Sequence, residues 1–324
     1  MENTDSSRLA ISFMRFFATI LITNAHLGPL YPPSLQLLST GGALGNSLFF
    51  FSSGYALYLS NREKGFYYWI TRRYTRIYPS LWIFIAFCSL LGISHYSLID
   101  YIIPPYWFLQ AILLFYILFF FTLKYFSHSL VYVCLFFLLP FLITYFATPH
   151  SDWIIENISD NYFLHWYFYY IIMLLGAITA SKRLITGNVK LILLFLFITL
   201  AIYYGLKIQI LHTQTPIYNL QLLLPIFLSL FSLYMFKLCS YFAKHTHQVK
   251  IIKVISFIAE LTLDIYIVQF IIMGYFSKFR FPTGFLLSII GIISCAYILH
   301  LASEYLTKML RRIFLYKKQT SLHR

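Results

Sequence analysis

The chain has 324 residues, of which 60% are hydrophobic and only 10% are charged, and its formal net charge is +14. This composition excludes a soluble globular protein, because such proteins carry about a quarter charged residues. We therefore expect an all-α, polytopic integral membrane protein, since a run of about 20 apolar residues crosses the bilayer as a helix.

Membrane-length apolar windows recur along the whole sequence and predict about ten transmembrane helices. The predicted spans are 9–28, 42–60, 78–94, 107–126, 130–148, 162–180, 189–208, 216–242, 251–276 and 281–303. They predict a single membrane domain over residues 1–324. A cytoplasmic N-terminus occupies 1–8, the ten helices lie within 9–303, and a basic cytoplasmic tail follows at 304–324.

The basic residues lie mostly on one side of this topology. With the N-terminus in the cytoplasm, all but four of the 24 Lys and Arg residues face the cytoplasm or its membrane surface; the exceptions are Arg15, Lys207, Lys278 and Arg280. By the positive-inside rule, this asymmetry places both termini in the cytoplasm. The acidic loop at 149–161 has no Lys or Arg and supports the same orientation. The positive charge therefore reflects topology, and we expect no nucleic-acid partner.

The first predicted span contains two ionisable residues, Arg15 and His26, eleven positions apart. At about 100° per residue both project from one helix face, roughly 16 Å apart along the axis. Ionisable groups at bilayer depth are costly and usually face a protein interior or a cavity. His26 is a candidate general base, because imidazole can take a proton from a hydroxyl at neutral pH. The alternatives are a histidine that meets lipid headgroups and an arginine that snorkels to them.

Three arginines, Arg72, Arg73 and Arg76, precede the third predicted span. Arg73 and Arg76 are three positions apart, so on a helical turn they lie side by side and could grip a phosphate or diphosphate together. The alternative is that these basic residues set topology or touch anionic lipid. Pro79 is expected in the first turn of the helix that follows.

Two other spans carry residues that predict interactions inside the membrane. Gly41 and Gly45 have the small-residue spacing that allows close helix packing. In the ninth span Glu260 and Asp264 are four positions apart, which predicts two carboxylates on one helix face. Such a pair suits a proton or ion path, or partners for a buried arginine, and Gln269 adds a neutral hydrogen-bonding group. The four cysteines are scattered singly, so we expect no metal site.

These motifs, in this order, resemble the acyltransferase-3 superfamily of bacterial integral membrane acyltransferases, whose members commonly O-acetylate lipopolysaccharide O-antigens and other surface glycans. The matching segments are Arg15 with ten intervening residues before His26, LFFFSSGY at 48–55, RYTR at 73–76 followed by IYP, WFL at 107–109, and LTLDIYIVQ at 261–269. The chain departs from the family at two positions. Ser47 stands where members often have an acidic residue and Gln269 where they often have a histidine, which puts a catalytic role for either position in doubt.

The resemblance implies a transferase that moves acetyl from cytoplasmic acetyl-CoA to a sugar hydroxyl of an undecaprenyl-linked glycan, at the periplasmic face of the bacterial inner membrane. It implies His26 as the catalytic histidine and Arg15 as a residue that positions the donor or organises the core. Arg73 and Arg76, with Arg72 beside them, would bind the CoA phosphates. Acetyl-CoA is then a co-substrate without a permanently bound cofactor, and the other partners are the lipid-linked glycan and membrane lipid. No feature indicates an oligomeric state.

Two other functional classes fit parts of the sequence. A transporter or flippase of a lipid-linked sugar would account for the many helices and for Glu260 and Asp264. An inverted repeat between the two halves would favour it, and the sequence has none that we detect. A non-catalytic membrane scaffold would leave Arg15 unexplained.

Overall fold

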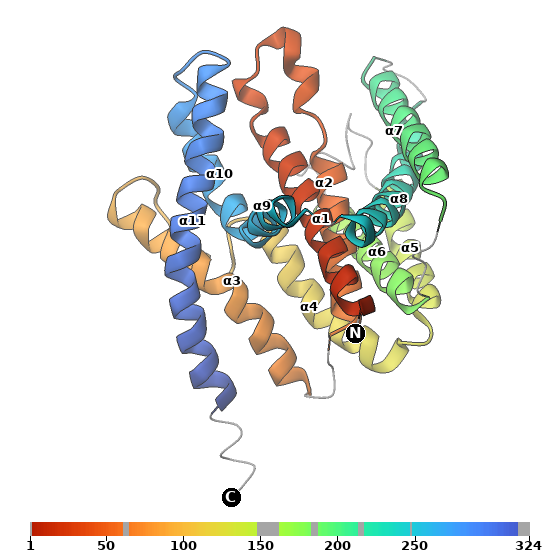
Figure 1. The fold of residues 1–324 in the computed structure, drawn as a ribbon, viewed down its shortest axis with the longest axis horizontal. Helices are drawn as coiled ribbons and strands as arrows, with labels where there is room; N and C mark the ends of the chain where they lie inside the picture. The colour runs from red at the N-terminus through yellow and green to blue at the C-terminus, as the bar shows by residue number, and fades with distance from the viewer. Residues whose placement is uncertain are drawn as a thin grey trace, which may run out of the picture. The chain divides into compact units, whose positions relative to one another are not determined.

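The computed structural model describes residues 2–60, 65–147, 162–182, 187–212, 217–246 and 248–316. These ranges are mostly helical and contain no strand, which confirms the all-α prediction. The α-helices are α1 Glu2–His26, α2 Gly42–Tyr58, α3 Gly65–Leu90, α4 Trp107–Phe126, α5 Leu130–Ala147, α6 Tyr162–Ser181, α7 Val189–His212, α8 Leu223–His245, α9 Val249–Glu260, α10 Thr262–Phe276 and α11 Thr283–Arg311 (Figure 1). The acidic loop at 149–161 and the end of the basic tail at 317–324 lie outside the described residues.

Seven of the described helices are long and apolar enough to cross a membrane, as expected for a multi-pass membrane protein. Their spans are Asp5–His26, Trp107–Phe126, Leu130–Ala147, Leu164–Ser181, Val189–Gln209, Leu220–His245 and Thr283–Phe314. The three other predicted spans correspond to α2, which has 17 residues, to α3, which carries three arginines, and to the pair α9 and α10.

The chain forms two compact units. The first comprises Met1–Ile22, Gly41–Ser60 and Phe126–Ala259, and the second comprises Thr23–Thr40, Asn61–Tyr125 and Glu260–Arg324. In the first unit α2 packs against α6 and α8, α5 packs against α6, and α7 packs against α8.

Two glycines in the first unit allow α2 and α6 to approach at backbone distance. A Cβ atom at Gly54 would overlap the carbonyl of Met173, and one at Gly176 would overlap the carbonyl of Phe51. Small residues at helix interfaces let backbones come this close, which matters in a membrane because lipid supplies no hydrophobic force between helices. Gly54 belongs to the LFFFSSGY segment, so this motif has a packing role.

The predicted close packing at the start of the second span holds for Gly45. A Cβ atom there would lie 2.7 Å from Ile22 Cγ1 and 2.9 Å from the Ala18 carbonyl oxygen of α1. Gly41 has a different role, because it precedes α2 with a φ of 120°. L side chains rarely adopt this conformation, so glycine is needed there for the backbone.

In the second unit α11 packs along α10 and α3, and Figure 1 shows it as the long blue helix. The helix α3 begins at Gly65, well before the predicted start near Tyr78. The prediction that Pro79 opens this helix is wrong, because Pro79 lies in its interior. The three arginines therefore sit on a helix and not in a loop.

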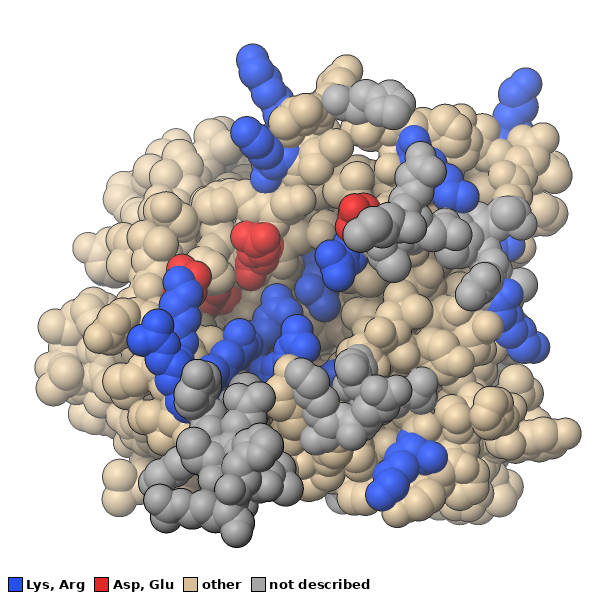
Figure 2. Space-filling view, turned by 60° about the horizontal axis from the view of Figure 1, so that its bottom comes forward, with Lys and Arg blue, Asp and Glu red and all other residues tan. Residues whose placement is uncertain are grey.

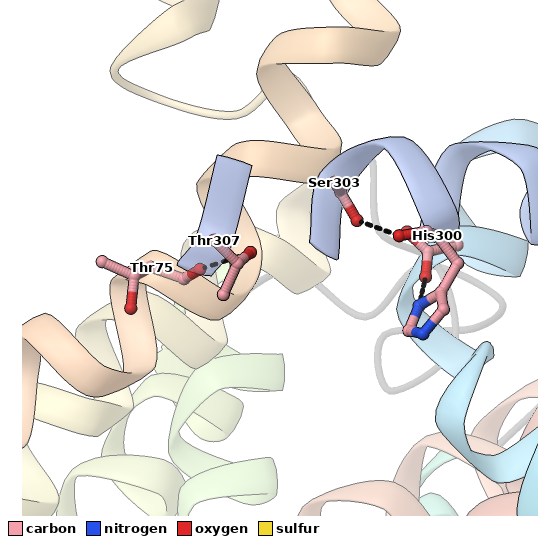
Figure 3. A network of polar contacts seen from close by, with 5 residues as sticks. Thr75, His300, Ser303 and Thr307 are labelled. Atoms are coloured by element: carbon pink, nitrogen blue, oxygen red, sulfur yellow. Dashed lines mark hydrogen bonds and ion pairs between the residues drawn. The ribbon is translucent and has the colours of Figure 1, made fainter. Parts of the chain in front are cut away.

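The interior position of Pro79 is compensated by a contact with α11. Proline has no backbone N–H, so the carbonyl of Thr75, four residues earlier, receives no hydrogen bond from Pro79. Thr307 of α11 supplies the missing donor, since its hydroxyl lies 3.1 Å from the Thr75 carbonyl oxygen (Figure 3). This bond joins α3 to α11 at the turn that carries the arginines.

The ninth predicted span is two helices. The helix α9 ends at Glu260, Leu261 has φ −77° and ψ −2°, and α10 begins at Thr262. Glu260 is exposed whereas Asp264 is buried. The prediction that these two carboxylates share one helix face is therefore wrong, because the helix is interrupted between them.

We expect Gly54→Ala and Gly176→Ala to reduce the amount of folded protein, because the added methyl meets backbone that cannot move aside. Overpacking costs about 1–3 kcal/mol or more. The readout is the monodisperse fraction and the apparent melting temperature after extraction in mild detergent. Gly205→Ala in α7 is the matched control, because nothing lies within 4 Å of its Cβ position. Equal behaviour of all three variants would contradict the close α2–α6 contact.

We expect Thr307→Val to lower the stability of the protein by about 1–3 kcal/mol or more, because it leaves the Thr75 carbonyl without this donor. In a Pro79→Ala background, Thr307→Val should lower the stability by less, because the backbone N–H of an alanine at position 79 can donate to the Thr75 carbonyl. The coupling is measured by a double-mutant cycle on the apparent melting temperature. Strictly additive effects would show that Thr307 does not replace the missing donor.

Candidate functional site

His26 ends α1 and packs against two aromatic residues of α10. Its ring centroid lies 4.6 Å from that of Phe270 and 6.2 Å from that of Tyr266. The imidazole is part-exposed, but its Nδ1 atom is buried and has no hydrogen-bond partner among the described residues. A buried polar atom without a partner is costly in a folded protein and is typical of functional positions.

The segment that follows His26 is hydrogen-bonded to the last turn of α1. Asn24 Nδ2 donates to the Leu38 carbonyl oxygen at 2.7 Å, and the Tyr31 hydroxyl donates to Asn24 Oδ1 at 2.7 Å. The Tyr31 ring also contacts Phe281 and Phe285 beside the start of α11. Asn24 therefore ties the segment 27–40, at Tyr31 and Leu38, to the end of α1 beside His26.

Two further aromatic residues, at the start of α4, pack against the rings of α10 that contact His26. Tyr106 stacks on Phe270 with centroids 6.1 Å apart and contacts Tyr266 at 5.9 Å, while Phe108 lies 5.0 Å from Tyr266. Tyr106 precedes α4, and burial raises its pKa. Its phenol therefore stays protonated at neutral pH and can donate a hydrogen bond. Phe108 of the WFL segment thus packs against Tyr266, one of the two rings that contact His26.

Arg15 lies three turns before His26 on the same helix, as predicted. It belongs to the first unit, and its Nε atom is buried. The Thr19 hydroxyl donates a hydrogen bond to the Arg15 carbonyl oxygen at 2.9 Å. The polar side chain of Thr19 therefore has a partner within one turn of this apolar helix.

Arg73 is packed against the body of the second unit. Its guanidinium carbon lies 3.2 Å from the Trp69 ring centroid, and Nη1 donates to the Trp69 carbonyl oxygen at 2.8 Å. Trp69 is itself buried and donates from Nε1 to the Tyr116 carbonyl oxygen at 2.9 Å. This cation–π stack places Arg73 on the side of α3 that faces α4, where a guanidinium contributes to packing as well as charge.

Arg72 and Arg76 lie one turn apart on α3, and both are exposed. A further arginine joins them from α11: Arg311 Nη2 lies 3.5 Å from the Arg72 carbonyl oxygen, and Arg311 Nε lies 3.3 Å from the Thr75 hydroxyl oxygen. We call Arg72, Arg76 and Arg311 the arginine cluster. Figure 2 shows one face of the molecule on which Lys and Arg side chains gather in one region.

A hydrogen-bonded pair of ionisable residues joins α10 and α11. Asp264 Oδ2 lies 2.9 Å from His300 Nδ1, and the side chains are 3% and 33% exposed respectively. The Ser303 hydroxyl donates to the His300 carbonyl oxygen at 3.0 Å (Figure 3). Asp264 therefore has a specific partner on another helix, whereas Glu260 is exposed.

The two positions that depart from the family pattern are both buried. Ser47 receives a hydrogen bond from the Ser232 hydroxyl of α8 at 3.0 Å, so it links two helices of the first unit. Gln269 of α10 is 1% exposed, and neither atom of its amide has a hydrogen-bond partner among the described residues.

The comparison with protein families agrees with the motifs. The acyltransferase-3 family model, described as an acyltransferase domain, matches residues 8–302 and so covers most of the chain. The chain belongs to the acyltransferase-3 family. A search of curated proteins and a search of solved structures each returned no match. The resemblance predicted from the motifs is thereby confirmed.

Within this acyltransferase, the structure distributes the predicted site residues over different surroundings. His26 lies in an aromatic environment, Arg72 and Arg76 are exposed together, and Arg73 is stacked on Trp69. Sequence reasoning missed Arg311 and His300. Neither carries a local signal, because Arg311 lies 239 positions from Arg72 and His300 lies 36 positions from Asp264.

We expect His300→Leu to destabilise the acyltransferase by about 3 kcal/mol, because it leaves the Asp264 carboxylate buried without this partner. The double variant Asp264→Leu/His300→Leu should recover part of the loss, since it removes the unpaired charge as well. The apparent melting temperatures of the two variants in detergent measure the difference. A double variant that is no more stable than His300→Leu would contradict the pairing.

Proposed function

We propose that this acyltransferase is an O-acetyltransferase of the bacterial inner membrane. It takes acetyl from cytoplasmic acetyl-CoA and transfers it to a sugar hydroxyl of lipid-linked O-antigen or a related surface glycan. The observation that carries the proposal is the position of His26. It is a part-exposed imidazole at a helix end, among aromatic side chains, in a chain of the acyltransferase-3 family.

The chemistry requires one base. A neutral imidazole accepts the proton of the sugar hydroxyl as the hydroxyl oxygen forms a bond to the thioester carbonyl carbon. The C–S bond then breaks, and the proton passes from His26 to the leaving thiolate of CoA. This sequence balances without a metal ion or a redox cofactor as reactant.

The surroundings of His26 suit a sugar acceptor. Ligand sites are lined mainly by aromatic and apolar side chains with a few polar groups that set orientation. Tyr266 and Phe270 supply aromatic surface, and Tyr106 supplies a phenol that stays protonated. The hydrogen bonds of Asn24 limit the movement of the segment after His26, which favours a fixed position of the base.

The donor and acceptor enter from opposite sides of the membrane in this proposal. Arg72, Arg73 and Arg76 lie on the side that the positive-inside rule assigns to the cytoplasm, where acetyl-CoA is available. His26 ends α1 on the other side. Arg15 lies earlier on the same helix and is the proposed residue that positions the acyl donor or organises the core.

The direct test is acetyl transfer by purified protein in detergent or nanodiscs. Labelled acetyl-CoA and the lipid-linked glycan of the source strain are the substrates, and label on the glycan is the readout. In cells, deletion of the gene should remove the mass of one acetyl group from each modified repeat unit of the surface polysaccharide. An unchanged glycan mass, together with no transfer in vitro, would refute the proposal.

We expect His26→Gln to lower acetyl transfer by about 100-fold or more, the contribution typical of a general base. Protein level and detergent extraction should remain as in the wild type. His128→Gln is the matched control, because His128 is an exposed histidine between α4 and α5. Retained transfer in the His26 variant would exclude His26 as the base.

A further inference from the structure

The arginine cluster gathers three positive charges from two helices. Arg72 and Arg76 are four positions apart on α3, an arrangement in which like charges repel. Arg311 belongs to α11, and its positive charge is repelled by the charges of Arg72 and Arg76. Such a cluster raises the free energy of the folded protein unless an anion offsets it.

No carboxylate forms an ion pair with this cluster in the part of the chain that the structure describes. The ion pairs there join Asp5 to Arg8, Asp264 to His300 and Glu304 to Lys308, and none includes a member of the cluster. Asp264 acts on Arg76 only at longer range, and its Oδ2 atom is bonded to His300. We therefore expect the anion that neutralises the cluster to come from outside the chain.

The guanidinium of Arg311 is held in a defined place. Thr307, one turn before it on α11, bonds the Thr75 carbonyl that Pro79 leaves without a donor. Arg311 Nε then meets the hydroxyl oxygen of the same Thr75. A cation fixed in this way has lost part of its side-chain freedom before a ligand arrives, which favours binding.

We propose that Arg311 acts with Arg72 and Arg76 as a binding residue for the phosphate groups of the acyl donor. Guanidinium groups bind phosphate oxygens through paired N–H donors, and several together suit a ligand with more than one phosphate. A phosphomonoester next to a diphosphate, as in CoA, matches three cations. The single phosphodiester charge of a common lipid headgroup does not. The inference rests on the proposed function and adds a residue outside the family match, which ends at residue 302.

The test compares Arg311→Gln with the wild type in nanodiscs of phosphatidylcholine. Equilibrium binding is measured with CoA, with dephospho-CoA and with pantetheine, which carries no phosphate. We expect the variant to bind CoA about 10- to 100-fold more weakly, the loss expected for a charged hydrogen-bonding partner, and to bind pantetheine as the wild type does. In the transfer assay the KM for acetyl-CoA should rise by a similar factor while kcat at saturating donor changes little.

Two further variants separate binding from folding. Arg311→Lys keeps the charge but not the paired donors, so its affinity for CoA should fall between those of the wild type and Arg311→Gln. Lys308→Gln is the matched control on the same helix, because Lys308 pairs with Glu304 at 2.8 Å and is not part of the cluster. Its affinity for CoA should equal that of the wild type.

Three results would overturn the inference. CoA affinity that is the same in Arg311→Gln and the wild type would remove Arg311 from the donor site. The wild type could be stabilised by phosphatidylglycerol nanodiscs relative to phosphatidylcholine nanodiscs. If Arg311→Gln lost this stabilisation but still bound CoA like the wild type, the arginine cluster would be assigned to a lipid headgroup. A wild-type protein that neither binds CoA nor transfers acetyl would refute the proposed function itself, which distinguishes that failure from the failure of Arg311 alone.

Discussion

The second unit depends on a backbone carbonyl that lacks the usual donor four residues later in its own helix. Pro79 interrupts the hydrogen-bond ladder of α3, and the carbonyl of Thr75 is bonded instead by Thr307 of α11. An unsatisfied carbonyl in an apolar environment costs several kcal/mol, so the two helices are tied at this level. The position of Arg311 follows from this contact, because it lies one helical turn beyond Thr307.

Two further pairs of polar side chains join membrane helices. Asp264 bonds His300 between α10 and α11, and Ser232 bonds Ser47 between α8 and α2. In hydrocarbon there is no water to replace such partners, so each pair fixes which helices meet and at which level. The first unit adds close backbone contact, with Gly54 and Gly176 at the crossing of α2 and α6. Hydrogen bonds and close packing therefore replace the hydrophobic force that assembles a soluble core.

The two ends of the proposed transfer reaction have opposite surroundings. His26 is among aromatic rings, where a neutral imidazole and an uncharged sugar hydroxyl are compatible. The arginine cluster is positively charged and two of its members, Arg72 and Arg76, are exposed, which suits the phosphates of a donor. Arg73 differs from its neighbours, because its stack on Trp69 gives it a packing role whether or not it also contacts the donor. The RYTR motif thus combines Arg73, which packs against Trp69, with Arg76, which is exposed and accessible to a ligand.

The sequence alone determined the features that depend on local spacing and composition. Apolar windows predicted a helical membrane protein, and an eleven-residue separation placed Arg15 and His26 on one helix. The ordered motifs indicated the acyltransferase-3 family. Only the tertiary structure placed Arg311 beside Arg72, paired Asp264 with His300, interrupted the ninth predicted span at Leu261 and kept Pro79 inside α3. The physical reason is that spacing fixes the face of a helix on which a residue lies, whereas the partner of that face depends on how distant helices pack.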